Sequence, residues 1–598
     1  MKPKLFAALA ALTVLLGSIR PADAQWQTQS VLVKPGWTAV YLNVDSTYQS
    51  LDQVVGSDPF NPIAEIWLWK APASTIQYLT TPSNPLTGSS DWAQWSRPGV
   101  GAASTFSALI PNAAYLVHSI ATTNYTWKIR GKPIAPSYTW TTTGLNFIGF
   151  PTPINNPPPF DTFLGFSPAF AGAAEIYQYI GGDLRAVNPS LVIPLVLHAT
   201  HVIRGQAYWI RAGSVFNDYF GPFQVSLGGS GEVALGTAGG QYSVYLHNTT
   251  ASNVVVCANL LPSETPPAGQ PPIAGTPPVL VRGNLNPTNL TYAYTDLSTG
   301  GAACWTLKPK GQPGSDITVV LGVNRTAMTG APGALYAGIM RFTDSFNLSQ
   351  VDVPVSAQAS SATGLWVGKA SVTQVGNYLK TYQRDLNNNP VVSSNGNYIV
   401  TSINTNLGAV AQSFPLRLIL HNDGTNVVLL QRVFYGLNAG SNLVVATQES
   451  ALDPQHLDTA RRISAADFPW SSTNQPWPFS GQFGPGGTLA VTVQLSYDDQ
   501  ASNPFLHTYH PDHDNLDTTF QTKLPRGSES YDVTRQITLN INPPGNDFAS
   551  LTAAGQSLYG TYLETITVAG LGSSTRDFNV SGAFTLNRIS PIPVLTRL

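Results

Sequence analysis

Charged side chains are scarce in this chain, and this limits what it can fold into. Asp, Glu, Lys and Arg make up 10% of the 598 residues, whereas ordinary soluble domains carry about 25%. Gly, Pro, Ser, Thr and Asn take their place. Long exposed helices rely on Lys and Glu for helix propensity and ion pairs, so such helices are not expected. The composition favours short strands joined by turns, and therefore an all-β chain that is long enough for several domains.

The N-terminus has the pattern of a secretory signal peptide. Lys2 and Lys4 precede an apolar run over 5–16, and Ala22-Asp23-Ala24 matches the small-x-small cleavage pattern. We predict a signal peptide over 1–24 and a protein that is secreted, periplasmic or held at the cell surface. The apolar run is short for a membrane span, and no later stretch reaches the roughly 20 apolar residues that a transmembrane helix needs. No transmembrane segment is therefore expected.

Two copies of a diverged repeat follow the signal peptide. Each copy contains three short runs of β-branched and aromatic residues, and such runs are typical of strands. The runs lie at 35–42, 64–69 and 113–117 in the first copy and at 143–150, 174–179 and 205–210 in the second. The interval between the second and third runs is longer in the first copy, which carries an insertion. We predict two small β modules, over 25–132 and 133–224, that bury a shared face by stacking.

Residues 225–359 are predicted to form an immunoglobulin-like β-sandwich, because short strand patterns alternate there with turn residues. A proline-rich stretch from Pro262 to Pro278 interrupts the pattern, either as an exposed loop or as a linker. The two cysteines of the chain, Cys257 and Cys304, lie on either side of this stretch. A small, even cysteine count in an exported chain favours one disulfide, with two buried free thiols as the alternative.

The remaining residues, 360–598, are assigned to a C-terminal β-sandwich-like domain. Its clearest local signal spans 414–433, where an Asp-Gly turn separates two strand patterns. An Asp-Gly turn in this setting is a strong predictor of a β-hairpin. Two further patterns, at 560–568 and 580–588, predict a closing pair of strands.

The strongest chemical signal in the sequence lies between residues 507 and 517. Three of the nine histidines are interleaved there with three aspartates. Imidazole with carboxylate suits Zn, whereas the carboxylates alone suit Ca²⁺. Pro511 argues against a continuous helix, so a loop would have to bring the ligands together. The candidate ligands of a divalent metal are His507, His510, Asp512, His513, Asp514 and Asp517. The alternative is a polar loop whose aspartates cap turns.

Tryptophans are concentrated in the first half of the chain. The set comprises Trp67, Trp69, Trp92, Trp95, Trp127, Trp140 and Trp209. Flat rings exposed on a β surface would offer large contact area to glycans, whereas buried rings would fill the cores of small modules. Burial in the core is the favoured interpretation.

Five segments of the C-terminal region form a specific set, at 364–368, 415–421, 503–515, 531–535 and 560–566. The set resembles a module of large exported proteins from bacteria of the Verrucomicrobia and Planctomycetes type. That module carries no assigned activity, so the resemblance implies secretion and domain limits rather than a function. Immunoglobulin-like domains in such proteins usually serve as spacers, which is an analogy at the level of the fold.

The sequence leaves two functions open. The first is an exported binding or structural protein, such as an adhesion or scaffold component, with a metal-stabilised loop and a glycan or cell-surface polymer as its partner. The alternative is a metal-dependent hydrolase or lyase acting on an extracellular polymer such as a polysaccharide, with Glu529, Asp532 and Glu564 as candidate carboxylates. A net charge of −2 offers no basic surface to phosphates, so nucleic acid is not expected as a partner.

Overall fold

A computed structural model shows an all-β, multidomain protein, in which strands account for 50% and helices for 5%. The predicted fold class is confirmed. The described residues are 25–70, 79–99, 103–138, 140–141, 144–167, 170, 175–211, 219–229, 231–238, 240–394, 398–430, 435–439, 442–446, 461–462, 477–498, 531–553, 555–570 and 576–594. Contacts divide the chain into two units: unit 1 runs to Ala359 and adds 547–552, and unit 2 comprises the rest from Ser360.

The first copy of the repeat forms a four-stranded antiparallel sheet in unit 1. In sheet order its strands are β2 (Gly36–Tyr41), β6 (Ala114–Ser119), β4 (Ile63–Trp69) and β5 (Trp92–Ser96). A three-stranded sheet of the same copy has the order β1 (Gln27–Val33), β7 (Tyr125–Pro133) and β3 (Val44–Asp45). The helix α2 (Leu51–Gly56) precedes β4 in the chain. It begins at a capping box, in which the side chains of Ser50 and Gln53 each bond the backbone N–H of the other.

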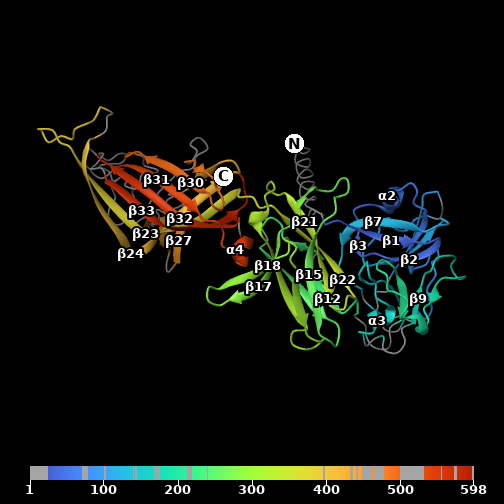
Figure 1. Ribbon diagram of the computed structural model, residues 1–598. Coiled ribbons are helices and arrows are strands. Elements are labelled where there is room, and N and C mark those ends of the chain that lie inside the picture. The colour runs from blue at the N-terminus through green and yellow to red at the C-terminus, as the bar shows by residue number, and fades with distance from the viewer. Residues whose placement is uncertain are drawn as a thin grey trace. The chain divides into compact units, whose positions relative to one another are not determined.

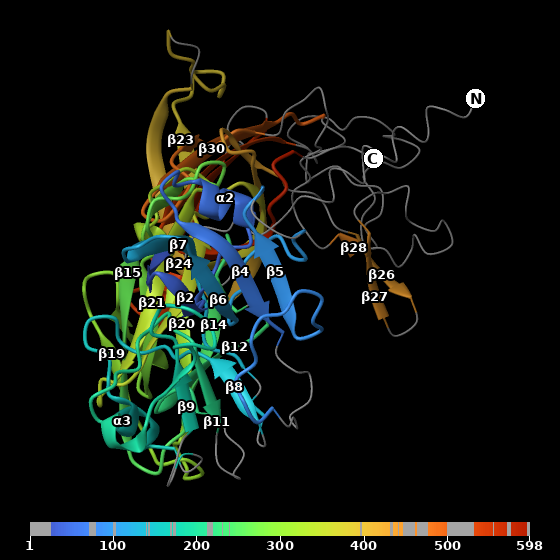
Figure 2. The ribbon, with the colours of Figure 1, turned by 90° about the vertical axis from the view of Figure 1, so that its right-hand side faces the viewer.

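The second copy has the same strand order (Figure 2). Its strands are β8 (Leu145–Ile148), β11 (Tyr208–Arg211), β9 (Glu175–Gln178) and β10 (Ser190–Leu191), with the helix α3 (Phe160–Leu164) before β9 and the 3-10 helix η2 (Pro194–Val196) after β10. Matching tyrosines strengthen the correspondence. The hydroxyl of Tyr115 accepts a hydrogen bond from the N–H of Ile110 at 2.8 Å, and that of Tyr208 accepts one from Ile203 at 2.9 Å. The repeat in the sequence is therefore a repeat in structure.

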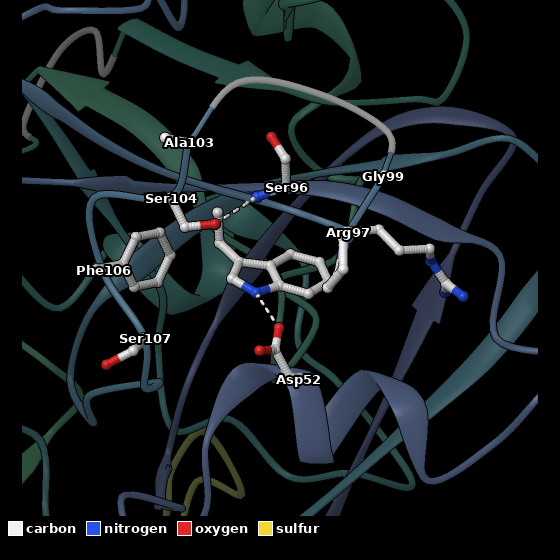
Figure 3. Close-up of a pocket in the computed structure, with 10 residues that line it drawn as sticks. Asp52, Ser96, Arg97, Gly99, Ala103, Ser104, Phe106 and Ser107 are labelled. Atoms are coloured by element: carbon white, nitrogen blue, oxygen red, sulfur yellow. Dashed lines mark hydrogen bonds between the residues drawn. The ribbon is translucent and has the colours of Figure 1, made fainter.

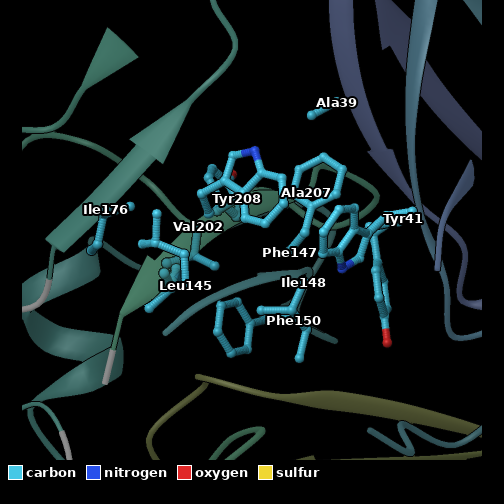
Figure 4. Close-up of a cluster of buried hydrophobic side chains, with 14 of the residues drawn as sticks. Ala39, Tyr41, Leu145, Phe147, Ile148, Phe150, Ile176, Val202, Ala207 and Tyr208 are labelled. Atoms are coloured by element: carbon cyan, nitrogen blue, oxygen red, sulfur yellow. The ribbon is translucent and has the colours of Figure 1, made fainter. Parts of the chain in front are cut away.

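The two copies share one hydrophobic core, as the stacking interpretation predicts (Figure 4). The ring of Trp209 stacks on Phe147 with centroids 4.5 Å apart and meets Trp69 of the first copy edge-on at 5.0 Å. The backbones are joined as well, because the N–H of Tyr41 donates to the carbonyl of Gly205 at 2.9 Å. Such contacts make the two copies one packed body.

The seven tryptophans that the sequence singles out lie in this shared core and in the neighbouring core of the first copy. Trp67, Trp69, Trp92, Trp95, Trp127, Trp140 and Trp209 are all buried, with at most 6% of any one exposed. The interpretation of these rings as core residues is confirmed. They fill the interior of the two copies, where each large ring removes much apolar surface from water.

Two sheets face each other in the central sandwich. The first has the order β12 (Phe223–Leu227), β14 (Gln241–Asn248), β20 (Asp316–Val323), β17 (Val279–Asn286) and β18 (Thr291–Asp296). The second has the order β13 (Val233–Ala234), β22 (Gln350–Gln358), β21 (Leu335–Asp344), β15 (Val254–Pro262) and β19 (Ala303–Leu307), with β16 (Ile273–Gly275) beside β21 and the 3-10 helix η3 (Arg325–Ala327) after β20. Buried side chains from both sheets form a single core, as expected for a β-sandwich.

The predicted disulfide is confirmed. Cys257 and Cys304 are bonded and lie directly opposite each other on β15 and β19. The proline-rich stretch between them is more ordered than the expected loop or linker. Within it, Ile273 pairs with Leu335 of β21, and the N–H of Glu264 donates to the carbonyl of Trp26 at 2.9 Å. The stretch is therefore a loop of the sandwich, as one of the two alternatives predicted, and it differs from that prediction only in carrying the short strand β16.

Unit 2 is built on one eight-stranded antiparallel sheet (Figure 1). Its order is β25 (Val427–Leu429), β24 (Val400–Asn422), β23 (Gly364–Tyr382), β33 (Arg576–Ser590), β32 (Ser557–Ala569), β31 (Asp532–Ile541), β30 (Thr488–Leu495) and β29 (Ser480–Gly481). Three short strands, β26 (Tyr435–Ala439), β27 (Asn442–Ala446) and β28 (Arg461–Arg462), pair with one another, and the helix α4 (Phe548–Ala553) follows β31. The predicted hairpin is confirmed by the pairing of β24 with β25, and the predicted closing strands by that of β32 with β33.

Helix α4 packs on the sandwich of unit 1, to which residues 547–552 belong. The ring of Phe548 is fully buried among side chains of β17 and β20. A Cβ atom on Gly322 of β20 would lie 2.3 Å from the Cγ2 of Thr552. A side chain at this position would therefore push the helix away from the sheet.

Candidate functional site

The predicted metal ligands lie outside the residues that the structure describes. All six, from His507 to Asp517, fall between 499 and 530, together with Glu529. The signal peptide over 1–24 is outside the described residues as well. Among the residues that are described, no group of three or more His, Cys, Asp or Glu side chains is placed to hold a metal ion. No helix in the described ranges is long and apolar enough to cross a membrane. The divalent metal at this cluster stays a prediction.

The other two candidate carboxylates are described, and each has a partner. Glu564 of β32 is fully buried; one carboxylate oxygen binds the guanidinium of Arg535, and the other accepts the hydroxyl of Tyr562 at 2.5 Å. Burial opposes the charge of Arg535, yet the Glu564 carboxylate outweighs it and raises the pKa of that guanidinium. Asp532 accepts the backbone N–H of Tyr497 at 2.8 Å. The buried pair of Glu564 and Arg535 is a structural element of the sheet.

A pocket lies between the start of helix α2 and the end of strand β5, and we call it the α2–β5 pocket (Figure 3). Backbone hydrogen bonds fix its walls. The N–H of Leu51, the first residue of α2, donates to the carbonyl of Ser107 at 2.7 Å, and the N–H of Thr105 donates to that of Gln94 at 2.7 Å. The segment 103–107 is therefore held between the helix and β5. The pocket encloses about 280 Å³, near the lower end of the range for small-molecule sites.

The lining of the α2–β5 pocket combines aromatic rings, hydroxyl groups and one carboxylate. Trp95 is buried, and its indole N–H donates to Oδ1 of Asp52 at 2.8 Å. Phe106, which is half-buried, also lines the pocket. The hydroxyl of Ser104 accepts a hydrogen bond from the N–H of Ser96 at 3.2 Å. Figure 3 shows Asp52, Phe106 and Ser104 around the pocket. The site can therefore offer apolar contact and hydrogen-bond acceptors to one ligand.

The only cationic side chain on the described pocket wall is turned away. Arg97 is one of the residues that line the pocket, but its guanidinium donates to the carbonyls of Ile63, at 3.0 Å, and Asn61, at 2.5 Å. Figure 3 shows this guanidinium directed away from Asp52. The carboxylate of Asp52 thus gives the pocket a negative character.

A buried ionic joint ties the repeat to the sandwich within unit 1. Asp352 of β22, whose side chain is fully buried, accepts from Nε of Arg341 at 2.7 Å and from the side-chain amide of Gln27 at 3.0 Å. Arg204 of the second copy approaches the same carboxylate at 3.4 Å and also donates to the carbonyl of Gln350 at 2.6 Å. Burial alone would raise the pKa of Asp352, but the two arginine charges outweigh it and hold that pKa below its usual range. One carboxylate therefore links β1, the second copy and the sandwich.

Comparison with known proteins found no matching family model and no matching curated protein. The resemblance of the C-terminal region to exported bacterial modules therefore stays a prediction.

The α2–β5 pocket was not foreseen from the sequence. Its residues come from helix α2, from the end of β5 and from the segment between β5 and β6. One signal was available, because the Ser50-x-x-Gln53 pattern is typical of a helix N-terminus.

Proposed function

We propose that this is an exported protein that binds an extracellular glycan or cell-surface polymer and presents its binding surface on a rigid β scaffold. It would act outside the cytoplasm, after removal of residues 1–24. The metal-stabilised loop at 507–517 is part of this proposal, as a structural site in which ligand geometry would fix the backbone.

The observation that carries the proposal is the set of buried contacts that join the parts of unit 1. The two copies share a core, and the Asp352 joint connects them to the sandwich through buried, charged hydrogen bonds. A second tie runs from Lys132 of β7 to Glu232, at 3.1 Å and largely buried. Domains that only share a linker usually move relative to one another. Extensive buried ties are what a scaffold or adhesion protein requires, since it must hold a binding surface in place.

The test is a co-sedimentation assay with the mature full-length protein. Insoluble polysaccharides and cell-wall preparations of different chemistry would be incubated with the protein, and the soluble fraction would be analysed for released saccharides. We expect retention on at least one polymer without release of product. Release of oligosaccharides that stops on addition of a chelator would instead support the metal-dependent hydrolase or lyase. Retention on no polymer would overturn the binding function.

A further inference from the structure

We propose that the α2–β5 pocket binds one neutral sugar residue of the polymer. The inference rests on the proposed function and adds the place and the chemistry of recognition. Three properties of the pocket carry it: its size, its pairing of aromatic with hydrogen-bonding side chains, and its charge.

The size of the pocket suits a single ring. A volume of about 280 Å³ lies just below the range of drug-sized ligand sites, about 300–1,000 Å³, which suits one sugar ring and no larger ligand. The rim is formed by Pro98, Gly99 and Ala103, which are all exposed. A polymer could therefore place one residue in the pocket and continue along the surface.

The chemistry of the pocket matches a sugar, which has apolar C–H faces and hydroxyl groups around its rim. Phe106, which is half-buried, supplies the aromatic contact, whereas Trp95 is only 2% exposed and holds Asp52 in place through its indole N–H. Oδ1 of Asp52 is used by the indole of Trp95, whereas Oδ2 receives no hydrogen bond from the described part of the chain. That oxygen can accept a sugar hydroxyl, and a charged acceptor forms the stronger kind of hydrogen bond. Ser104 and Ser107 also line the pocket, and a serine hydroxyl can donate or accept.

The charge of the pocket selects a neutral ligand. Asp52 would repel a uronic acid, a sulfate or a phosphate, and the guanidinium of Arg97 is engaged by two backbone carbonyls instead of facing the ligand. Asp52 is exposed, and a like charge placed directly beside its carboxylate still costs free energy. Neutral hexoses, pentoses and N-acetylhexosamines remain as the class that fits.

The test is saturation-transfer NMR on the mature full-length protein with methyl glycosides as probes. The probes are neutral methyl hexosides, a pentoside and an N-acetylhexosaminide, with methyl glucuronide as the anionic probe and choline as the cationic one. We expect signals from at least one neutral glycoside and none from the glucuronide. Asp52→Asn keeps the acceptor for Trp95 but removes the charge, and it should weaken binding about tenfold. Ala103→Trp fills the pocket from its exposed rim and should abolish the signal.

The internal repeat supplies a matched control. Asp161 occupies the first turn of α3 as Asp52 occupies that of α2, so Asp161→Asn should leave binding unchanged. No signal from any neutral glycoside, a signal that survives Ala103→Trp with the fold intact, or a signal from choline alone would each overturn the inference. Retention of both wild type and Ala103→Trp on the same polymer would overturn the pocket assignment while leaving the proposed function standing. Retention of neither would remove the proposed function itself.

Discussion

Replacement of Asp352 by asparagine tests the ionic joint of unit 1. Asparagine has nearly the same size but no charge, so the guanidiniums of Arg204 and Arg341 lose their counter-ion. These side chains are only 10% and 23% exposed, and the side chain of Asp352 is fully buried. Removing one partner of a buried pair costs about 3–5 kcal/mol. Because both arginines keep some contact with water, we expect the lower end, about 3 kcal/mol of the free energy of unfolding.

Urea denaturation of the mature full-length protein, followed by tryptophan fluorescence, measures this loss. Ten of the 13 tryptophans precede residue 360, so the signal reports mainly on unit 1. The control is Asp316→Asn, which changes a carboxylate that lies 2.6 Å from Nδ1 of His247 but is 65% exposed. Exposed pairs contribute at most about 1 kcal/mol. A loss for Asp352→Asn no larger than that of the control would refute the reasoning.

Three further outcomes follow from the structure and the sequence. The folded-state pKa of Asp352 lies below its unfolded value of about 4. The stabilisation by its carboxylate is therefore present above that pH and is lost as pH falls through the folded pKa. Urea midpoints of the wild type should drop below about pH 4, and those of Asp352→Asn should depend less on pH. Replacement of both Cys257 and Cys304 by serine should lower the free energy of unfolding by up to about 4 kcal/mol, measured by the same titration, because the bridge closes a loop with a sequence separation of 47. Elemental analysis should find one divalent metal per mature chain, and both His510→Ala and His513→Ala should lose it; a wild type without metal would reduce the cluster to a polar loop.

The strands of the repeat could be predicted because the information is local. Alternating aromatic and β-branched runs mark each strand, and the matching runs of the two copies became β2, β4 and β6 in one sheet and β8, β9 and β11 in the other. The hairpin at β24 and β25 was predictable for the same reason, since the Asp423-Gly424 turn fixes its register. The burial of the tryptophans also followed from composition.

The ionic joint and the pocket could not be predicted, because they depend on residues that are distant in sequence. Arg204 and Asp352 are 148 positions apart, and nothing local in either segment indicates the other. Asp52 meets Trp95 only after α2 has packed beside β5. Glu564 was proposed as a catalytic carboxylate, and only tertiary structure pairs it with Arg535. Buried charges need partners, but the sequence does not say which ones.

The most direct test of a glycan-binding function is a binding isotherm on the polymer that best retains the mature protein, measured for the wild type and for Ala103→Trp. The account predicts saturable binding of the wild type, no release of saccharide, and a large loss of affinity in the variant. Equal binding of the two proteins would contradict the pocket as the site of recognition. Absence of saturable binding of the wild type to every polymer would contradict the function itself.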